Sequence, residues 1–250
     1  MMKKLLVLSL LLLLPLTGCQ KNPVTTKKES TTTEIIAKNQ QKFQKAQKNT
    51  SVIHTNDFTG DYLGPANTLT ELLENRSKGY AVIKGTVYNL ESMSEPKNMV
   101  WTKTSIRVDQ VLTGKKSLKG KTLQVPLKGG LSTTDEYYQD MKKPDKNQKI
   151  LVQNDMAPLP KIGSQVIIRL EKVDLTKESD YTNYLKNSGF KESTAYNPFY
   201  EQSNLWIKEP GKKKFVLNSS LIKHQQKTNG MDYAAGMEKL TKEINAKYNK

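Results

Sequence analysis

The sequence contains few of the residues from which catalytic and metal sites are most often built. Among its 250 residues there are one cysteine and two histidines. A single cysteine, Cys19, cannot form an intrachain disulfide, so the hydrophobic core has to stabilise the fold unaided. His54 and His224 lie outside any catalytic motif, and two histidines without a second thiol exclude a zinc site of His and Cys ligands. We therefore expect no cofactor, no bound metal and no histidine-based catalysis.

Long hydrophobic runs are equally scarce. The only one is Leu5–Leu14, which follows Lys3 and Lys4 and has Ser9 as its single polar member. As a helix it would be about 15 Å long, against roughly 30 Å for the core of a bilayer. The run is therefore too short to span a membrane and is typical of the apolar region of a signal peptide.

The residues that follow this run decide the type of signal. Leu16-Thr17-Gly18-Cys19 resembles the lipobox of bacterial lipoproteins, in which the cysteine receives a diacylglyceryl group and a peptidase cuts just before it. Two acyl chains suffice for stable anchoring, since each buried CH₂ contributes roughly 0.8 kcal/mol. The resemblance implies a signal peptide over residues 1–18, lipidation of Cys19 and a place on the extracytoplasmic face of the cell membrane. The alternative is an ordinary secretory signal with an accidental cysteine.

Acidic residues are in deficit. The 40 Lys and Arg and 24 Asp and Glu give a net charge of +16, and loss of Lys3 and Lys4 with the signal leaves +14. This excess of positive charge predicts attraction to anionic lipid head groups or wall polymers. The alternative is that the charge only keeps a surface protein soluble. A nucleic-acid-binding face would need clustered cations with interleaved aromatic residues or a known motif. The cations are spread out instead, so we expect no nucleic-acid partner.

The stretch after Cys19 is rich in Lys, Thr and Ser. Residues 19–50 are predicted to form a flexible, lipid-anchored tether. Thr31 and Glu34 have the spacing of a capping box, which favours a short helix through about Lys48; the alternative is that this part is simply more tether. Thr68 and Glu71 repeat that spacing and predict a short helix that extends toward the glycine at position 79.

The middle of the chain is typical of short strands separated by turn signals. Thr104, Ile106 and Val108 alternate with polar residues and are expected to point inward. Gly85 predicts a bulge or bend. Two long polar stretches, 130–148 and 179–202, are expected to be loops. The predicted strands are 80–90, 100–112, 122–127, 149–153, 164–173, 205–208 and 214–217.

About seven strands with a helix at each end predict a mainly β fold, all-β or α+β. We expect a small antiparallel barrel or sandwich over residues 51–230, with a short N-terminal helix. A C-terminal amphipathic helix is expected over 231–250, because apolar residues recur there on one face. These residues are Tyr233, Met237, Leu240, Ile244 and Tyr248.

Four segments between residues 79 and 170 resemble a loosely defined group of exported bacterial proteins. They read G-Y-A-V-I-K-G-T-V, S-I-R-V-D-Q-V-L-T-G, G-K-T-L-Q-V-P-L-K-G-G and K-I-G-S-Q-V-I-I-R-L. The resemblance implies a small OB-like barrel, and it implies no particular function. The chain departs from the group at Ile167-Ile168-Arg169-Leu170, where a more apolar strand would be expected.

Aromatic residues offer the main indication of a binding site, because Trp and Tyr carry much of the energy of protein interfaces. The candidate ligand-binding or partner-binding residues are Trp101, Tyr181, Tyr184, Tyr196 and Trp206. The alternative for the two tryptophans is that they pack in or beside the sheet.

Together these features predict a membrane-anchored extracytoplasmic lipoprotein. It would act as a non-enzymatic binding or interaction module whose partner is an envelope protein or an anionic wall polymer. One alternative is a wall-polymer hydrolase using paired loop carboxylates, for which Asp57, Asp61, Asp135 and Glu136 are candidates by residue type. Another, minor alternative is that a released signal fragment, residues 8–18, acts as a peptide pheromone, as such fragments do in some Gram-positive bacteria.

Overall fold

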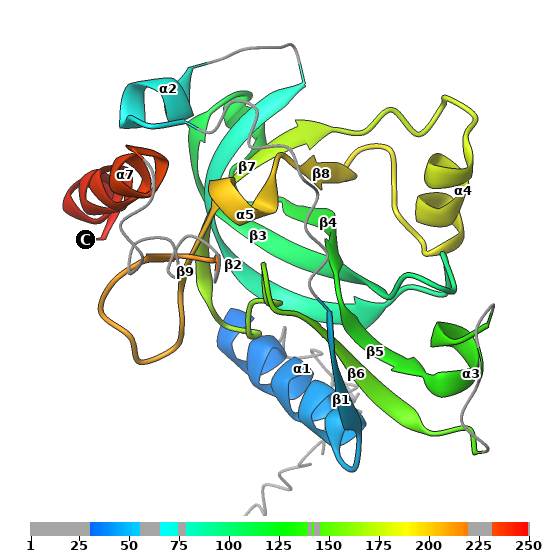
Figure 1. Ribbon diagram of the computed structural model, residues 1–250. Coiled ribbons are helices and arrows are strands. Elements are labelled where there is room, and N and C mark those ends of the chain that lie inside the picture. The colour runs from blue at the N-terminus through cyan, green and yellow to red at the C-terminus, as the bar shows by residue number, and fades with distance from the viewer. Residues whose placement is uncertain are drawn as a thin grey trace, which may run out of the picture. The chain divides into compact units, whose positions relative to one another are not determined.

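Ten strands in two sheets form the framework of the computed structural model, which describes residues 31–55, 66–74, 79–139, 142, 146–219 and 232–249 (Figure 1). The strands are β1 (Ser51–Thr55), β2 (Tyr80–Ser92), β3 (Trp101–Thr113), β4 (Thr122–Lys128), β5 (Gly130–Thr133), β6 (Lys149–Asn154), β7 (Gln165–Lys172), β8 (Tyr196–Pro198), β9 (Leu205–Lys208) and β10 (Val216–Leu217). The large sheet has the order β10-β9-β7-β2-β3-β4, with β8 beside β7, and all of its pairs are antiparallel. The small sheet has the order β1-β6-β5, in which β1 and β6 are parallel.

Six helices and a short 3₁₀ turn complete the described part of the chain. They are α1 (Thr32–Gln47), α2 (Leu69–Leu73), the turn η1 (Lys116–Leu118), α3 (Thr134–Tyr137), α4 (Asp180–Asn187), α5 (Glu201–Asn204) and α7 (Asp232–Tyr248).

The predicted mainly β class is confirmed, and the two sheets fit a sandwich rather than a closed barrel. Within the described ranges the large sheet ends at β4 on one side and β10 on the other, and these strands do not pair. The chain leaves β4 through Gly129 and Gly130, whose φ angles of +90° and +131° favour glycine. This bend carries the chain into the small sheet instead of continuing the large one.

The alternation predicted for β3 is confirmed. Thr104, Ile106 and Val108 are buried, while the residues between them are partly exposed. The predicted irregularity at Gly85 is also present, because the register of β2 against β3 shifts there. A Cβ atom on Gly85 would lie 2.6 Å from the carbonyl oxygen of Arg107, so only glycine fits this close approach.

The strand β7 is buried on both faces. Ile168 and Leu170 belong to the main hydrophobic core, and Ile167 belongs to a second cluster under α7 and α2. Burial on both faces explains why Val166, Ile167 and Ile168 of β7 are consecutive apolar residues, since a strand with one solvated face would alternate.

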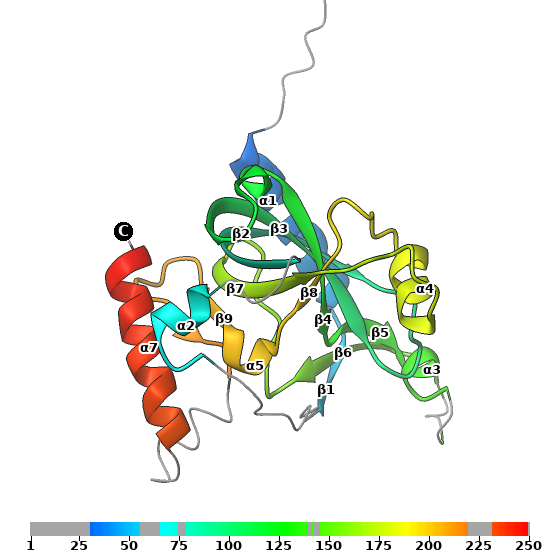
Figure 2. The same ribbon diagram turned by 90° about the horizontal axis from the view of Figure 1, so that it is seen from above.

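The C-terminal helix packs as its sequence predicts. Met237, Leu240 and Ile244 are fully buried against the large sheet. Figure 2 shows α7 beside α2, and the backbone N–H of Leu69 donates to the carboxylate of Glu243 at 3.0 Å. The two helices therefore cover one face of the large sheet together.

The helix α1 begins at the predicted capping box and is fixed to the sheet. Thr31 is its N-cap, with both reciprocal hydrogen bonds present. The amide of Asn39 donates to the carbonyl of Tyr88 at 2.9 Å, and that of Gln40 donates to the carbonyl of Ile162 at 2.8 Å. The part of the predicted tether that follows Thr31 is thus a packed helix.

The regions predicted as loops, 130–148 and 179–202, contain short elements: β5 and α3 in the first, and α4, β8 and α5 in the second. The prediction of loops was therefore wrong for these elements. The helix α4 starts with a capping box in which Thr182 replaces the usual Glu, because the Thr182 N–H donates to Ser179 Oγ at 3.1 Å and the Ser179 N–H donates to Thr182 Oγ1 at 3.0 Å. The helix α2 is shorter than predicted and ends at Leu73.

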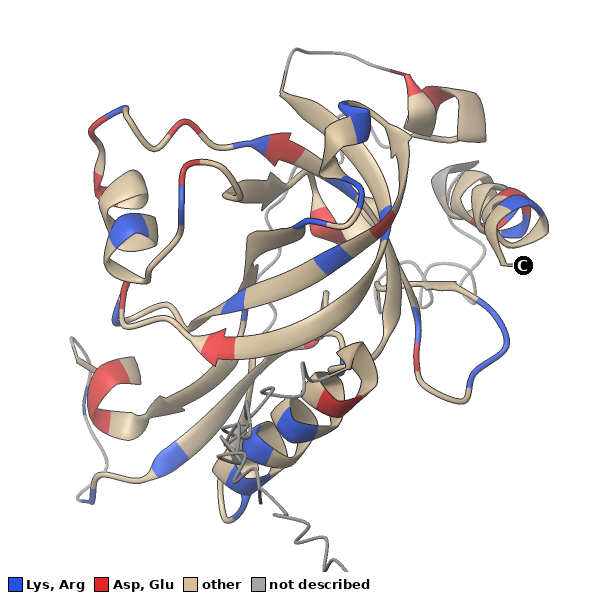
Figure 3. Ribbon diagram, turned by 180° about the vertical axis from the view of Figure 1, so that it is seen from behind, with Lys and Arg blue, Asp and Glu red and all other residues tan. Residues whose placement is uncertain are grey.

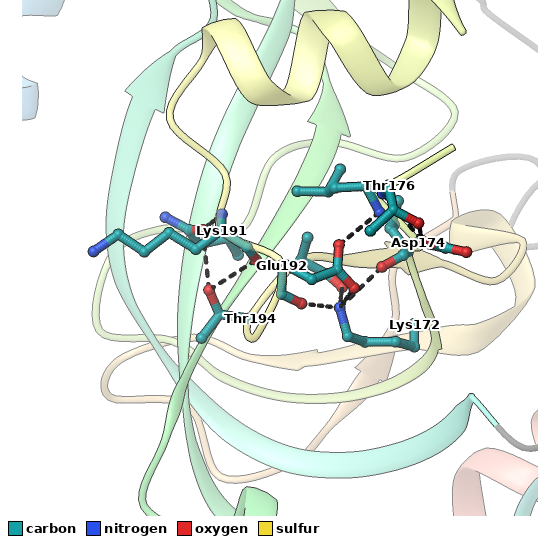
Figure 4. A network of polar contacts seen from close by, with 10 residues as sticks. Lys172, Asp174, Thr176, Lys191, Glu192 and Thr194 are labelled. Carbon is teal, nitrogen blue, oxygen red and sulfur yellow. Dashed lines mark hydrogen bonds and ion pairs between the residues drawn. The ribbon is translucent and has the colours of Figure 1, made fainter. Parts of the chain in front are cut away.

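Residues 173–204 follow β7, and we call them the covering segment. The side chain of Lys172, the last residue of β7, folds back and hydrogen-bonds this segment. Its ammonium group donates to the carbonyl oxygens of Val173 at 2.9 Å and Ala195 at 3.3 Å, and also to that of Glu192. The Glu192 carboxylate lies 3.3 Å from the same ammonium. Figure 4 shows the side chains of Lys172 and Glu192 pointing toward each other. One side chain therefore connects the two ends of residues 173–195, the first part of the covering segment.

Gln124 of β4 attaches the covering segment at a second point. Its side-chain oxygen accepts hydrogen bonds from the Lys191 N–H at 2.9 Å and from Thr194 Oγ1 at 3.1 Å. Its backbone N–H donates to the Thr194 carbonyl at 2.8 Å. The covering segment is thereby held against β4 at the edge of the large sheet.

We predict that Lys172→Met destabilises the protein by roughly 2 kcal/mol, because carbonyl groups that are partly buried lose a charged donor. Urea unfolding measures the loss, and limited proteolysis should show new cleavage within the covering segment. The control is Lys161→Met, whose ammonium pairs with exposed Glu209 and is expected to contribute less than about 1 kcal/mol. Equal losses in the two variants would contradict the anchoring role of Lys172.

Candidate functional site

A groove of about 400 Å³ lies between the β3–β4 edge of the large sheet and the covering segment. This volume falls in the range of roughly 300–1,000 Å³ that small-ligand sites occupy. We call it the aromatic groove. It is lined by Trp101, Pro126, Lys128, Tyr181, Pro198, Phe199, Tyr200, Glu201 and Gln202.

Trp101 and Tyr181 face each other in the aromatic groove. Their rings meet edge to face, with centroids 5.6 Å apart and planes at 66°. Trp101 lies opposite Lys128 in the β3–β4 register, whereas Tyr181 comes from α4. The Tyr181 hydroxyl donates to the side-chain oxygen of Asn197, and burial raises the pKa of Tyr181 above its ordinary value. Tyr181 therefore stays neutral and is held in place.

Phe199 and Tyr200 form the opposite part of the lining. Their rings are edge to face at 4.7 Å. The guanidinium of buried Arg169 lies 4.3 Å from the Phe199 ring and 4.6 Å from that of Tyr80, so it is stacked between two aromatic rings. This stacking fixes Phe199. The arginine that interrupts the apolar β7 strand thus supports the aromatic groove.

Tyr200 has a backbone conformation that side chains rarely adopt. Its φ of 47° and ψ of 73° lie in the left-handed region, at a cost of the order of 1 kcal/mol. Its carbonyl accepts hydrogen bonds from the N–H groups of Ser203 and Asn204, both at 3.0 Å. The strained turn places the next residue, Glu201, at the groove.

Glu201 is the most unusual group in the aromatic groove. The residue is 8% exposed, and no other described residue forms a hydrogen bond or ion pair with its carboxyl group. Burial raises the pKa of Glu201 to about 7, while the charge of Lys128 acts in the opposite direction. The carboxyl oxygens of Glu201 are not among the fully enclosed polar atoms of the described residues, so a ligand in the aromatic groove can reach this carboxyl and hydrogen-bond it.

The predicted site residues are distributed over different parts of the fold. Trp101 and Tyr181 line the aromatic groove, and Tyr184 is half-buried on α4 outside it. Tyr196 is buried with the Lys172 ammonium 5.5 Å from its ring centre. Trp206 is fully buried under α7, where its indole N–H donates to Thr241 Oγ1 at 2.9 Å. Cys19, Asp57, Asp61 and His224 lie outside the described residues.

Phe199 and Tyr200 belong to the tyrosine-rich stretch 181–200 whose aromatic residues were expected to contact a ligand or partner, whereas Glu201 and Lys128 were not predicted as site residues. A signal was present, because Phe199 and Tyr200 form an aromatic pair directly before a carboxylate in a long polar region. No local pattern indicates that this short run faces Lys128, which comes from a strand about seventy residues earlier.

The other polar groups considered as catalytic candidates do not form a catalytic arrangement with the aromatic groove. His54 Nδ1 lies 2.9 Å from Asp155 Oδ1, and hydrogen bonds from His54 and Gln153 hold the pKa of Asp155 below its ordinary value. No hydroxyl in the described part of the chain bonds to the second ring nitrogen of His54. Asp135 and Glu136 are exposed neighbours on α3, away from the aromatic groove.

The described ranges contain neither a metal cluster nor a membrane-spanning helix. No group of three His, Cys, Asp or Glu side chains there could hold a metal ion. No helix there is both long and apolar enough to cross a bilayer.

We predict that Glu201→Gln stabilises the protein, and does so more at high pH. Because the folded-state pKa is raised from 4.5 to about 7, folding is most stable below pH 4.5 and loses stability as the pH rises through 7. Glu201→Gln should leave the free energy of unfolding unchanged near pH 4 and raise it by roughly 3 kcal/mol near pH 8. Urea unfolding at both pH values measures this difference in free energy. The exposed control Glu136→Gln should change stability by less than about 0.5 kcal/mol at either pH, and a pH-independent effect of Glu201→Gln would refute the assignment.

In comparisons with known proteins, no protein-family model, curated protein or solved structure matches the chain.

Proposed function

We propose that this chain is a membrane-anchored extracytoplasmic lipoprotein that recognises an envelope component in the aromatic groove without transforming it. The observation that carries this proposal is the buried Glu201 carboxyl, which lines the groove and has no hydrogen-bond partner among the described residues. A ligand with a hydrogen-bond donor would give this carboxyl a partner that none of the described residues provides. Four aromatic rings around the carboxyl supply the contact area that a specific ligand needs.

The anchor in this proposal is the lipid on Cys19, which rests on the resemblance of residues 16–19 to a lipobox. A diacylated cysteine gives stable attachment through two chains. The aromatic groove would then act next to the outer surface of the cell membrane, where envelope components are concentrated.

The positive charge provides a second, less selective attraction to anionic wall polymers or lipid head groups. Lys38, Lys42 and Lys45 are all exposed, and spacings of four and three residues place them on one face of α1. Figure 3 shows the cations along this helix in blue. Salt screens such an attraction, whereas it affects an aromatic groove far less, so salt dependence separates the two modes.

The alternative of a wall-polymer hydrolase gains no specific support. Glycoside hydrolysis generally uses two carboxyl groups about 5 to 10 Å apart, and Glu201 is the one carboxyl that lines the described groove. Asp135 and Glu136 lie on α3, and Asp57 and Asp61 are outside the described residues.

We predict that Trp101→Ala weakens capture of the envelope component by about thirty-fold, the equivalent of roughly 2 kcal/mol for loss of an interface hot spot. The full chain is purified in detergent, immobilised and incubated with envelope extract at low and high salt. Bound material is then identified by mass spectrometry and sugar analysis.

The matched control is Tyr184→Ala, which removes an aromatic ring from α4 outside the aromatic groove and should leave capture unchanged. Material that Trp101→Ala still retains at high salt would show that the groove is not the binding site. Breakdown of a polymer by the wild type but not by Glu201→Gln would instead favour the hydrolase.

We predict that the chain expressed in a bacterial host is cut before Cys19 and carries a diacylglyceryl group there. The mature protein should partition into the detergent phase on phase separation, and the mass of its N-terminal peptide should include the lipid. Cys19→Ser should remain uncut and unlipidated. A soluble mature protein with a different N-terminus would rule out the lipoprotein assignment.

A further inference from the structure

The lining of the aromatic groove restricts the chemistry of its ligand. A purely apolar ligand would leave the Glu201 carboxyl buried without a partner, so the ligand must carry hydrogen-bonding groups. A cationic ligand would bring a second positive charge beside Lys128, and an anionic one would bring a second negative charge beside Glu201. The groove therefore favours a ligand without net charge.

The arrangement of the lining favours a ligand with one apolar face and a polar edge. Trp101, Tyr181 and Phe199 supply flat aromatic surfaces, while Glu201 and Lys128 supply polar groups in the same groove. A pyranose ring has this character, because its C–H groups present an apolar face and its hydroxyl groups lie at the edge. Hydroxyl groups can both donate to and accept from a carboxyl group, so they match Glu201 whether or not it is protonated.

We infer that the aromatic groove binds an uncharged sugar ring of an envelope glycan. The ring stacks on the indole of Trp101, and its hydroxyl groups hydrogen-bond the carboxyl of Glu201 and the ammonium of Lys128. This inference rests on the proposed function and adds the chemical class of the ligand. The volume of about 400 Å³ suits a ligand of one or two rings.

The two tryptophans allow a direct test in the full chain. Trp206 is fully buried and its indole N–H is bonded to Thr241, whereas Trp101 lines the aromatic groove. With 5-fluorotryptophan incorporated, the protein gives one fluorine NMR signal for each tryptophan, and Trp101→Phe assigns them. Oligomers of N-acetylglucosamine and of glucose serve as probes. At least one of them should shift the Trp101 signal in a saturable way and leave that of Trp206 in place.

Glu201→Leu separates a binding role from a structural one. Leucine is similar in volume and removes the unpaired buried carboxyl, so the melting temperature should stay the same or rise. The dissociation constant for the active oligosaccharide should rise at least tenfold. Glu136→Gln and Tyr184→Ala are the matched controls, and both should leave this dissociation constant unchanged. Sugar binding that survives Glu201→Leu would overturn the role of this carboxyl.

Tetramethylammonium chloride, sodium polyphosphate and a proline-rich peptide are titrated in parallel. If one of them shifts the Trp101 signal and the oligosaccharides do not, the inference of a sugar ligand is wrong. Capture of envelope material that depends on Trp101 would in that case still support the proposed function. Capture that does not depend on Trp101 would refute the proposed function itself.

Discussion

The aromatic groove exists because the covering segment is held against the large sheet, by the pairing of β8 with β7 and by the side chains of Lys172 and Gln124. One half of the groove, with Trp101 and Lys128, is part of the large sheet. The other half comes from the covering segment, whose regular elements α4, β8 and α5 are all short. Hydrogen bonds from Lys172 to carbonyl groups at both ends of the loop, together with those to Gln124, bring the halves together.

Two features that cost stability lie side by side in the groove. Tyr200 has a left-handed backbone, and the neighbouring Glu201 has a largely buried carboxyl without a hydrogen-bond partner among the described residues. By contrast, the strands and α7 follow ordinary rules of alternation and burial. Local departures of this kind are expected at functional sites, where the fold holds a group in a state that a ligand completes. The stacking of Arg169 between two rings provides rigid support for this arrangement.

Elements with a repeating local pattern could be predicted from the sequence. The alternation around Ile106 identified β3, and the stripe that includes Leu240 identified α7, because each pattern records which side faces the core. The elements of the covering segment have three to eight residues and no such repeat. Their positions depend on partners such as Gln124, about seventy residues away in the sequence. The same limit applies to Trp206, because residue type alone does not show that α7 covers it.

The packing of α1 would also limit how far the protein reaches from a membrane to which it is anchored as proposed. Hydrogen bonds from Asn39 and Gln40 make this helix part of the domain rather than of the tether. With a lipid on Cys19, as proposed, residues 20–30 remain as the spacer, and eleven residues span at most about 40 Å even when fully extended. The aromatic groove would therefore sample a thin layer beside the bilayer. Glycans deep in a thick wall would lie beyond its range, and membrane-proximal or newly exported chains would be the ligands it meets.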